Sequence, residues 1–535
     1  MKFLKSKALS FILVAILIFT TACNKNNSSE NKNSKNSNEK EKVSQEIIIG
    51  ENSDYGGYDP LKGGVKPFTI RAMIFDTLVK LDYDYNKAPG LATEWSRSED
   101  SKTWTFKLRK NVTFHDGENW NSKAAKSNLE HRIAVEKKGL YANIESIETP
   151  DDYTLVIKLK KPNYLFDSDL TLPNRGFISP KAFDENHKVI ASIGTGPFKF
   201  VEWKKDAEVI LEANEKYYDG SPKIKKVTIK NIPDSNARAL ALESGEIDFM
   251  SGRSALTSLE TLKKKDNIKL DKRIGQTSVF VFMNTRDAVL SDINVRKAVS
   301  FGTNFKSAVP ALLSDLASPP ENYFSPVFKK YTFSDVKLPE YNKEKAIQSL
   351  KDSNYSDTNN DGYVDKDGKN LSLTITVTDN NEEDKALAEI MQNQLKDIGI
   401  ELKIKPLDNA ALYESTKNDQ YQLTIQGQNY VQHDDPSINY KEGYWHSQSY
   451  NHPYYDKDLD AMIDKLYYSG DSDERIKLHN EIQKYVMDKY AVIMVFHRNN
   501  VVLMNKKVKD FKIAAGTWQF YKGLETAYKI GRAHV

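Results

Sequence analysis

Two stretches of the chain carry the pattern of a strand, a helix and a second strand, and this pattern restricts the fold more than any other feature. In the first stretch, Val227 and Ile229 alternate with polar residues as in a strand, and Glu246–Met250 forms the second strand. Ser235 is placed to cap the helix between them, and Gly245 to end it.

The second stretch covers residues 371–404 and repeats this order. Apolar residues alternate over 371–377, recur at helical spacing over 387–398 and alternate again over 400–404, with Gly399 ending the helix. Such crossovers join parallel strands and cover their sheet with helices. Two of them therefore predict two α/β lobes.

Two nearly continuous apolar runs, Ser278–Asn284 and Ala491–Phe496, are typical of buried strands. We expect them to carry the chain from one lobe to the other and back, which makes a hinge with a cleft. Small ligands favour clefts between domains and the carboxyl ends of α/β sheets. Further strands are expected at Glu46–Gly50 and Thr154–Leu159.

The charge balance argues against a polyanionic partner. The 535 residues include 77 Lys and Arg against 74 Asp and Glu, mixed along the chain, so nucleic-acid binding is not predicted. A single cysteine excludes an intramolecular disulfide framework and a Cys-rich metal site. Nothing in the sequence demands more than a monomer.

The N-terminus predicts an export signal over residues 1–22. Lysines precede an apolar run, Ala8–Phe19, that is too short for a transmembrane helix. The run ends just before Cys23 and resembles the lipobox of bacterial lipoproteins, although Thr20 stands where Leu is usual. We expect a lipidated Cys23, followed through residue 45 by a polar, disordered tether. The alternative is a secreted protein with a chance cysteine.

The other end of the chain, Ile530–Val535, resembles a translated sequencing adapter. We therefore expect that a short native end is missing there, and we exclude His534 from any site.

Signatures of catalysis are missing from the sequence. It contains no H-E-x-x-H, G-x-S-x-G, P-loop or G-x-G-x-x-G motif. The adjacent carboxylates Asp434-Asp435 and Glu382-Glu383 are interpreted as solvated surface groups. A secreted hydrolase would need an activated nucleophile, for which there is no candidate, so we predict that the protein is not an enzyme.

One acidic loop has the spacing of a calcium site. Oxygen-bearing side chains occupy positions 1, 3, 5 and 9 of an EF-hand-like loop, but Gly368 stands where a bidentate Glu belongs. A polar turn explains the same residues, so calcium is only a weak alternative. The four residues are Asp357, Asn359, Asp361 and Asp365.

Three histidines, His433, His446 and His452, lie among aromatic residues. Imidazole is the commonest transition-metal ligand, and aromatic faces suit peptides or chelates. A surface loop with packed aromatic side chains is the alternative.

Four ordered blocks resemble the solute-binding proteins of ABC importers in the peptide/nickel class, family 5. The resemblance covers most of Glu46–Lys529, and its blocks are Pro89–Gly117, Ile193–Phe198, Ala239–Asp248 and Asn294–Ala298. It implies a two-lobed α/β fold like that of periplasmic binding proteins (class II, cluster C type), with hinge-linked lobes around a central cleft. The expected lobes are 46–280, with an inserted subdomain at roughly 75–165, and 281–497, with 498–529 returning to the first.

Within the family, Leu170–Arg175 is similar to a stretch of the nickel-chelate and metallophore branch whose arginine binds ligand carboxylates. Arg175 is displaced by one residue from that pattern, and Phe68 stands where a pocket methionine is expected. The resemblance implies His446 as the contact to a metal through a chelate, with His452 in reserve. The aromatic wall would consist of Tyr430, Tyr444 and Trp445.

The resemblance implies an extracytoplasmic lipoprotein on the outer face of the cell membrane. It would deliver a nickel chelate or a short peptide to an ABC permease and its ATPase, without a cofactor of its own. An oligopeptide-specific binding protein is the alternative within the class. A peptide-pheromone receptor or sensor without transport is the alternative outside it.

Overall fold

The computed structural model describes residues 44–59, 68–136, 139–252, 257–379, 381–428, 434–449 and 456–531. The predicted signal, Cys23, the tether up to residue 43, Tyr430, His433, His452 and residues 532–535 lie outside these ranges. Residues 43–535 form one compact unit. None of the helices in the described ranges has the length and apolar character needed to cross a bilayer.

An eleven-stranded sheet runs through this unit. Ten strands follow the order β17-β16-β18-β12-β19-β11-β1-β10-β9-β8, and β13 pairs with β19. The strands are β1 (Glu46–Glu51), β8 (Phe198–Lys204), β9 (Glu208–Ala213), β10 (Lys226–Asn231), β11 (Phe249–Ser251), β12 (Ile268–Met283), β13 (Ala317–Ser318), β16 (Ser372–Thr378), β17 (Glu401–Leu407), β18 (Leu423–Gln428) and β19 (Val492–Asn505).

Both predicted strand–helix–strand units are present. In the first, β10 and β11 pair in parallel with β1 between them, and α4 (Ser235–Ser244) connects them. Asp234, not Ser235, caps α4 by accepting from the backbone of Ala237 at 2.7 Å, and Gly245 follows with φ of +82°. In the second, β16 and β17 are parallel and α9 (Glu382–Lys396) joins them.

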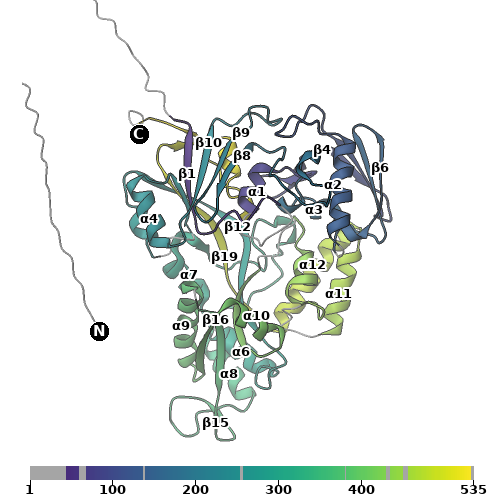
Figure 1. Cartoon of the computed structure of the whole chain (residues 1–535). Coiled ribbons are helices and arrows are strands. Elements are labelled where there is room, and N and C mark those ends of the chain that lie inside the picture. The colour runs from purple at the N-terminus through teal and green to yellow at the C-terminus, as the bar shows by residue number, and fades with distance from the viewer. Residues whose placement is uncertain are drawn as a thin grey trace, which may run out of the picture. The chain divides into compact units, whose positions relative to one another are not determined.

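The two predicted buried strands are also present, and they are longer than their apolar runs. β12 has 16 residues and β19 has 14, and the two pair with each other along most of their length (Figure 1). Near its C-terminal end β19 pairs with β11, and near its own C-terminal end β12 pairs with β18. The pairing register shifts between Ile274 and Ser278, as at a β-bulge, which bends a strand.

The bulge divides the sheet into two parts. Lobe I here denotes the elements from β1 to β11, which include a small sheet of order β4-β5-β7-β6, and lobe II denotes β16–β18 with the helices that follow β12. The small sheet consists of β4 (Ala92–Arg97), β5 (Thr103–Leu108), β6 (Ile144–Asp151) and β7 (Thr154–Leu159), and α2 (Ser122–Val135) packs on it. The exact lobe boundaries at residues 280 and 497 stay a prediction, because β12 and β19 belong to both parts.

The remaining elements are short hairpins and helices. The hairpins are β2 (Val79–Leu81) with β3 (Lys87–Pro89), β14 (Asp365–Lys366) with β15 (Lys369–Asn370), and β20 (Val508–Lys509) with β21 (Tyr528–Lys529). The helices are α1 (Phe68–Ile74), α3 (Phe166–Asp169), α5 (Leu259–Leu262), α6 (Ile293–Phe301), α7 (Phe305–Leu313), α8 (Lys343–Asp352), α10 (Asn409–Lys417), α11 (Lys457–Tyr468) and α12 (Ser472–Asp488).

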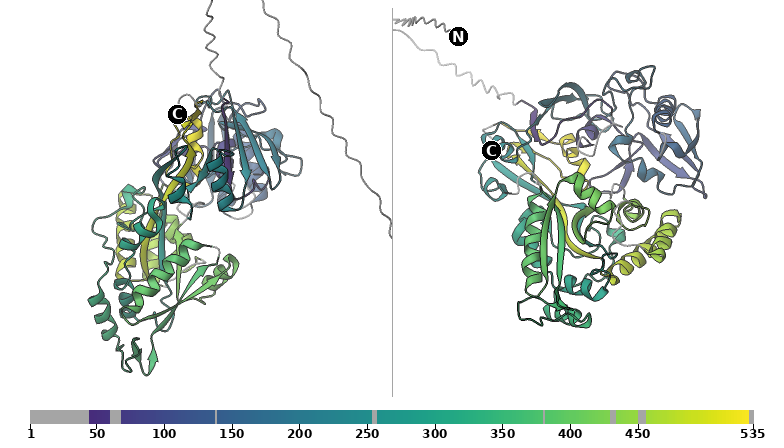
Figure 2. Two further views of the ribbon diagram at one scale, coloured as in Figure 1. Left: turned by 90° about the vertical axis from the view of Figure 1, so that its left-hand side faces the viewer. Right: turned by 60° about the horizontal axis from the view of Figure 1, so that its bottom comes forward.

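The α11–α12 hairpin of lobe II contacts the small-sheet side of lobe I. Arg97 of β4 donates to the carbonyl of Gly470, in the turn between the two helices, at 2.8 Å. Figure 1 and the right-hand view of Figure 2 both show the yellow-green hairpin beside the blue elements of lobe I.

Candidate functional site

Aromatic side chains from both lobes meet in one buried cluster, called the seam cluster here. Phe68, at the start of α1, lies in it with 8% exposure, and Trp445 with 0%. The ring of Trp445 lies 5.9 Å from that of Phe282 of β12. The cluster's aromatic members are Phe68, Tyr85, Phe280, Phe282, Tyr323, Phe324, Phe328, Tyr440, Trp445 and Trp518.

Trp445 has a feature that a packed core residue seldom has. Among the described residues, its indole Nε1 has no hydrogen-bond partner although the side chain is fully buried. Buried donors are paired in the great majority of cases. Tyr444 ends a π-helix, Asn439–Tyr444, directly before it.

His446 lies next to Trp445 in sequence but is surrounded by polar groups. Its Nδ1 accepts from the backbone of Gln448 at 3.1 Å, and its Nε2 lies 3.3 Å from the carboxylate of Asp464 and 3.0 Å from Lys441 Nζ. The residue is 2% exposed. Both ring nitrogens are therefore engaged by protein groups.

Arg175 lies in lobe I, at the end of a 3₁₀ turn, Pro173–Arg175. One of its guanidinium nitrogens is 3.2 Å from the carboxylate of Glu136, and the group lies over the ring of Tyr141 at 4.9 Å. Arg132 lies over the same ring at 5.1 Å. The contacts of Arg175 and those of His446 thus involve different sets of residues, and the ligand role of each stays a prediction.

The acidic loop before β14 forms a turn in which the side-chain oxygens accept hydrogen bonds from donors of the same loop. Asp357 accepts from the backbone of Gly362 at 3.0 Å, and Asp361 accepts from the backbone of Tyr363 at 2.9 Å. Asn359 accepts from the backbone of Asp361 at 2.9 Å, and Asp365 accepts from Thr358. In the described ranges, no group of three or more His, Cys, Asp or Glu side chains is arranged to hold a metal ion.

The interpretation of the adjacent carboxylates as solvated was wrong for two of the residues. Asp435 is 4% exposed and Glu383 is 6% exposed. Glu383 forms a two-bond ion pair with Arg498 of β19, at 2.9 Å and 2.5 Å. Nothing in a short acidic run shows that an arginine distant in sequence will pack on it.

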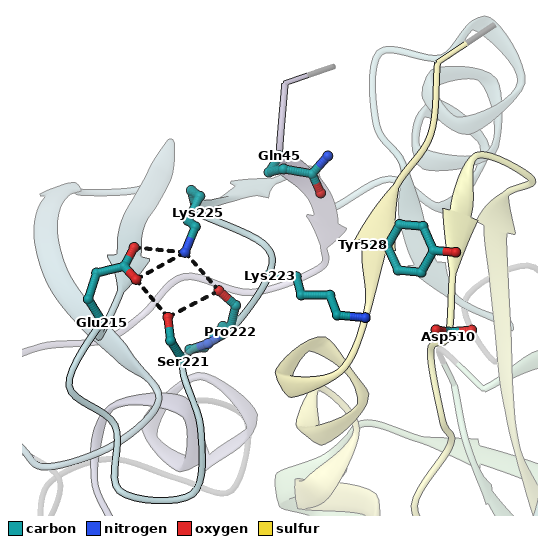
Figure 3. Close-up of a pocket in the computed structure, with 8 residues that line it drawn as sticks. All are labelled: Gln45, Glu215, Ser221, Pro222, Lys223, Lys225, Asp510 and Tyr528. Atoms are coloured by element: carbon teal, nitrogen blue, oxygen red, sulfur yellow. Dashed lines mark hydrogen bonds and ion pairs between the residues drawn. The ribbon is translucent and has the colours of Figure 1, made fainter. Parts of the chain in front are cut away.

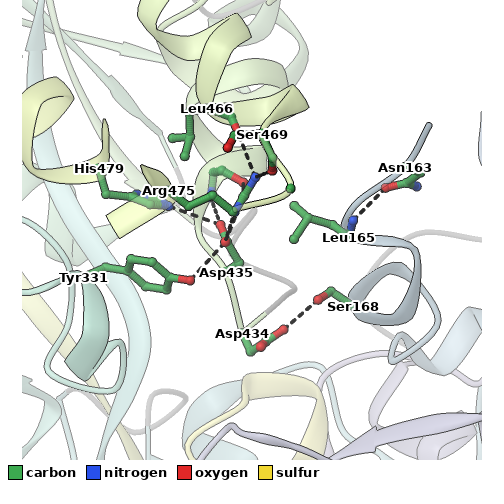
Figure 4. Close-up of polar contacts among 12 residues, drawn as sticks. Asn163, Leu165, Ser168, Tyr331, Asp434, Asp435, Leu466, Ser469, Arg475 and His479 are labelled. Carbon is green, nitrogen blue, oxygen red and sulfur yellow. Dashed lines mark hydrogen bonds and ion pairs between the residues drawn. The ribbon is translucent and has the colours of Figure 1, made fainter. Parts of the chain in front are cut away.

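Asp435 is the centre of a buried network (Figure 4). Arg475 of α12 donates to Asp435 Oδ2 from Nε at 3.0 Å and from Nη2 at 2.8 Å, and Tyr331 donates at 3.0 Å. His479 Nε2 lies 3.2 Å from Oδ1. Burial raises the pKa of Asp435, but the hydrogen bond from His479 and the charge of Arg475 outweigh it and hold the pKa well below its usual range.

A separate hollow of about 680 Å³ lies on lobe I, where the chain enters the compact unit (Figure 3). Lys225 and Ser221 at its wall both bind the carboxylate of Glu215, at 2.8 Å and 2.7 Å. Because these polar groups are already paired with one another, the hollow is not the better candidate for ligand capture.

Comparison with known proteins places this geometry in a family. Residues 87–451 match the model of the bacterial extracellular solute-binding proteins, family 5. The oligopeptide-binding protein AppA of Bacillus subtilis is 30% identical over 421 residues, which are 75% of this chain and 76% of AppA. The nickel-binding periplasmic protein of Escherichia coli is 29% identical over 365 residues, 66% of this chain and 69% of that protein.

Solved structures of similar proteins superimpose on this chain over nearly its whole described length. AppA in complex with a nonapeptide superimposes with a TM-score of 0.71 at 25% identity, covering 91% of this chain and 99% of AppA. A nickel ABC transporter protein from Bacillus halodurans gives 0.74 at 28% identity, covering 89% of this chain and 98% of that one. These relatives are solute-binding proteins and not enzymes. The relatives named here bind oligopeptides and nickel, and the chain belongs, as they do, to family 5 of the bacterial extracellular solute-binding proteins, a class of ABC-importer substrate-binding proteins.

Proposed function

We propose that this protein captures short peptides between its two lobes and delivers them to an ABC permease and its ATPase. The observation that carries the proposal is the seam cluster, in which aromatic side chains from both lobes lie together. Aromatic surfaces suit the apolar side chains of peptides, while backbone pairing supplies affinity with loose sequence selectivity. Contacts made with both lobes favour closure around the ligand.

Trp445 is the ligand contact that we propose from this cluster. A peptide carbonyl would accept from its indole N–H, which has no partner among the described residues. Trp445→Phe should therefore weaken peptide binding by about tenfold, the value of one buried hydrogen bond. Trp104 is the matched control, because its indole N–H also lacks a partner in the described ranges but lies in the separate core of the small sheet.

Native mass spectrometry of the compact unit 43–535, titrated with a mixed peptide pool, tests the proposal. We expect retained peptides whose binding is independent of metal, weakened by Trp445→Phe and unchanged by Trp104→Phe. Retention of no peptide at all would contradict peptide capture. Equal weakening by both variants would remove Trp445 from the ligand site.

A nickel chelate is the second candidate, and the nickel-binding relatives favour it. In that case His446 would contact the metal through the chelate, with Arg175 binding a ligand carboxylate. His446 would first have to exchange the partners it has on both ring nitrogens. Titration of the same unit with nickel and free histidine distinguishes the two: an adduct that His446→Ala abolishes would establish the chelate.

We also propose that lipidated Cys23 anchors the protein to the outer face of the cell membrane. Replacement of the single cysteine by serine removes the acylation site, and each buried methylene of an acyl chain contributes about 0.8 kcal/mol to membrane binding. The Cys23→Ser protein should be recovered from the soluble fraction, whereas the parent protein should sediment with membranes. A parent protein that is itself soluble would support the chance-cysteine alternative.

A further inference from the structure

The two lobes are joined by direct polar contacts outside the seam cluster. Asp434 of lobe II accepts from Ser168 Oγ of α3 at 2.7 Å, and its second oxygen lies 3.7 Å from Lys87 Nζ of β3 (Figure 4 shows the Ser168 bond). Lys87 is in turn held by Asp167 at 2.8 Å. The side chain of Asp434 is 25% exposed and that of Lys87 is 27% exposed, so solvent screens this interlobe pair only in part.

A second contact joins the same two parts of the molecule. Arg97 of β4 donates to Ser101 Oγ at 2.7 Å and to the carbonyl of Gly470 at 2.8 Å. Its guanidinium lies over the ring of Tyr164 at 5.3 Å. Gly470 packs so closely on this ring that a Cβ there would overlap it. The turn between α11 and α12 therefore fits a surface of lobe I that is already formed.

Asp434 is held firmly on the lobe II side. Its neighbour Asp435 is bound by Arg475 of α12, and Arg475 also donates to the carbonyl of Leu466, at the end of α11, at 2.6 Å. The bonds tie residues 434–435, α11 and α12 into one block. Because the block is already ordered, Asp434 and Gly470 can contact lobe I at the same time. Neither residue has to be ordered separately when the lobes close.

We infer that Lys87, Ser168, Arg97 and Tyr164 form a latch in lobe I that binds Asp434 and the α11–α12 turn and favours closure in the absence of ligand. The inference rests on the proposed capture function and gives the small-sheet side of lobe I a role in it. Because the latch stabilises the closed form without contacting ligand, it slows ligand release. It acts by raising the population of the closed state that the ligand binds.

Single-molecule energy transfer between the lobes tests the latch without any ligand. The only cysteine of the chain, Cys23, lies outside the compact unit 43–535, so Lys123→Cys on α2 and Lys403→Cys on β17 give one dye pair. Both side chains are well exposed, at 81% and 61%. In this background, Asp434→Asn should lower the ratio of closed to open molecules by about tenfold, because it removes a charge-assisted contact.

Ser168→Ala is the second variant, and it removes one hydroxyl without touching the charge. It should shift the same ratio in the same direction, and the double variant should shift it by less than the product of the single effects, because both changes weaken the hydrogen bond between Ser168 and residue 434. Asp219→Asn is the matched control, since Asp219 pairs with Lys80 at 2.6 Å inside lobe I. It should leave the ratio unchanged.

An unchanged ratio in both Asp434→Asn and Ser168→Ala would overturn the latch. A loss of peptide affinity in Asp434→Asn with an unchanged ligand-free ratio would make Asp434 a ligand contact instead. Because the dye measurement uses no peptide, its outcome does not depend on the peptide titration. Failure of the proposed function and failure of the latch are therefore separate results.

Discussion

A buried histidine at the crossing between the lobes makes stability depend on pH. His497 of β19 is 1% exposed, its Nδ1 lies 3.0 Å from Ser278 Oγ, and burial lowers its pKa to about 4. In the unfolded chain the pKa of a histidine is about 6.5. Between these two values the unfolded state binds more protons, so the free energy of unfolding falls as the pH falls through this window.

Urea unfolding at pH 7.5, 6 and 5 measures this effect. His497 should contribute a loss of up to about 3 kcal/mol at the acid end of the window, and His497→Gln should reduce the slope below pH 6.5. His115, whose pKa burial also lowers to about 4, keeps part of the slope in the variant. His187→Gln, at an exposed histidine, serves as the control for the substitution itself. Identical slopes in all three proteins would contradict the assignment.

The buried carboxylate of Asp435 should contribute strongly to the stability of the folded protein. Replacing Asp435 by asparagine leaves the charge of Arg475 buried without its counter-charge, and breaking a buried ion pair costs about 3–5 kcal/mol. Asp435→Asn should therefore lower the urea midpoint strongly, whereas Asp434→Asn, at a partly exposed residue, should lower it far less. Two equal midpoints would mean that the network contributes little to stability.

At the scale of elements, hydrophobic periodicity predicted both strand–helix–strand units but not their ends. Asp234 caps α4 where Ser235 was expected, and β11 begins at Phe249 where residue 246 was expected. Either neighbouring residue has a side chain that can cap, and the backbone angles decide which one does. β12 extends ten residues before its apolar run, because pairing with β19 continues where the side chains are partly polar.

Gly245 ends α4 in the left-handed conformation, with φ of +82° and open space where a Cβ would stand. Gly245→Ala should therefore lower the free energy of unfolding by about 1–2 kcal/mol through backbone strain alone. Gly245→Asn should cost less, because asparagine tolerates this conformation. Chemical denaturation of the three proteins measures the order, and an alanine variant as stable as the asparagine variant would contradict it.

At the scale of the whole molecule, the sequence predicted the fold class and family better than the site. Trp445 does lie in a cluster shared by both lobes, but Arg175 and His446 each have partners of their own. A sequence motif identifies a candidate residue. The contacts of that residue, however, depend on how α11 packs against residues 439–446. Those long-range contacts leave no local pattern, and the burial of Asp435 left none either.

The two crossing strands predict that the lobes unfold together. β12 and β19 are shared by both parts of the sheet, so lobe II cannot unfold without breaking strands that also hold lobe I.

Leu373 of β16 is fully buried in lobe II, and Leu373→Ala should lower the free energy of unfolding by about 2–5 kcal/mol. Tryptophan fluorescence reports largely on lobe I, because four tryptophans lie there: Trp95, Trp104, Trp120 and Trp203. In urea, the variant should shift the fluorescence transition as far as the far-UV circular dichroism transition. A fluorescence transition that stays in place while the dichroism transition moves would show that the lobes unfold independently, and the crossing strands would then act as a flexible hinge.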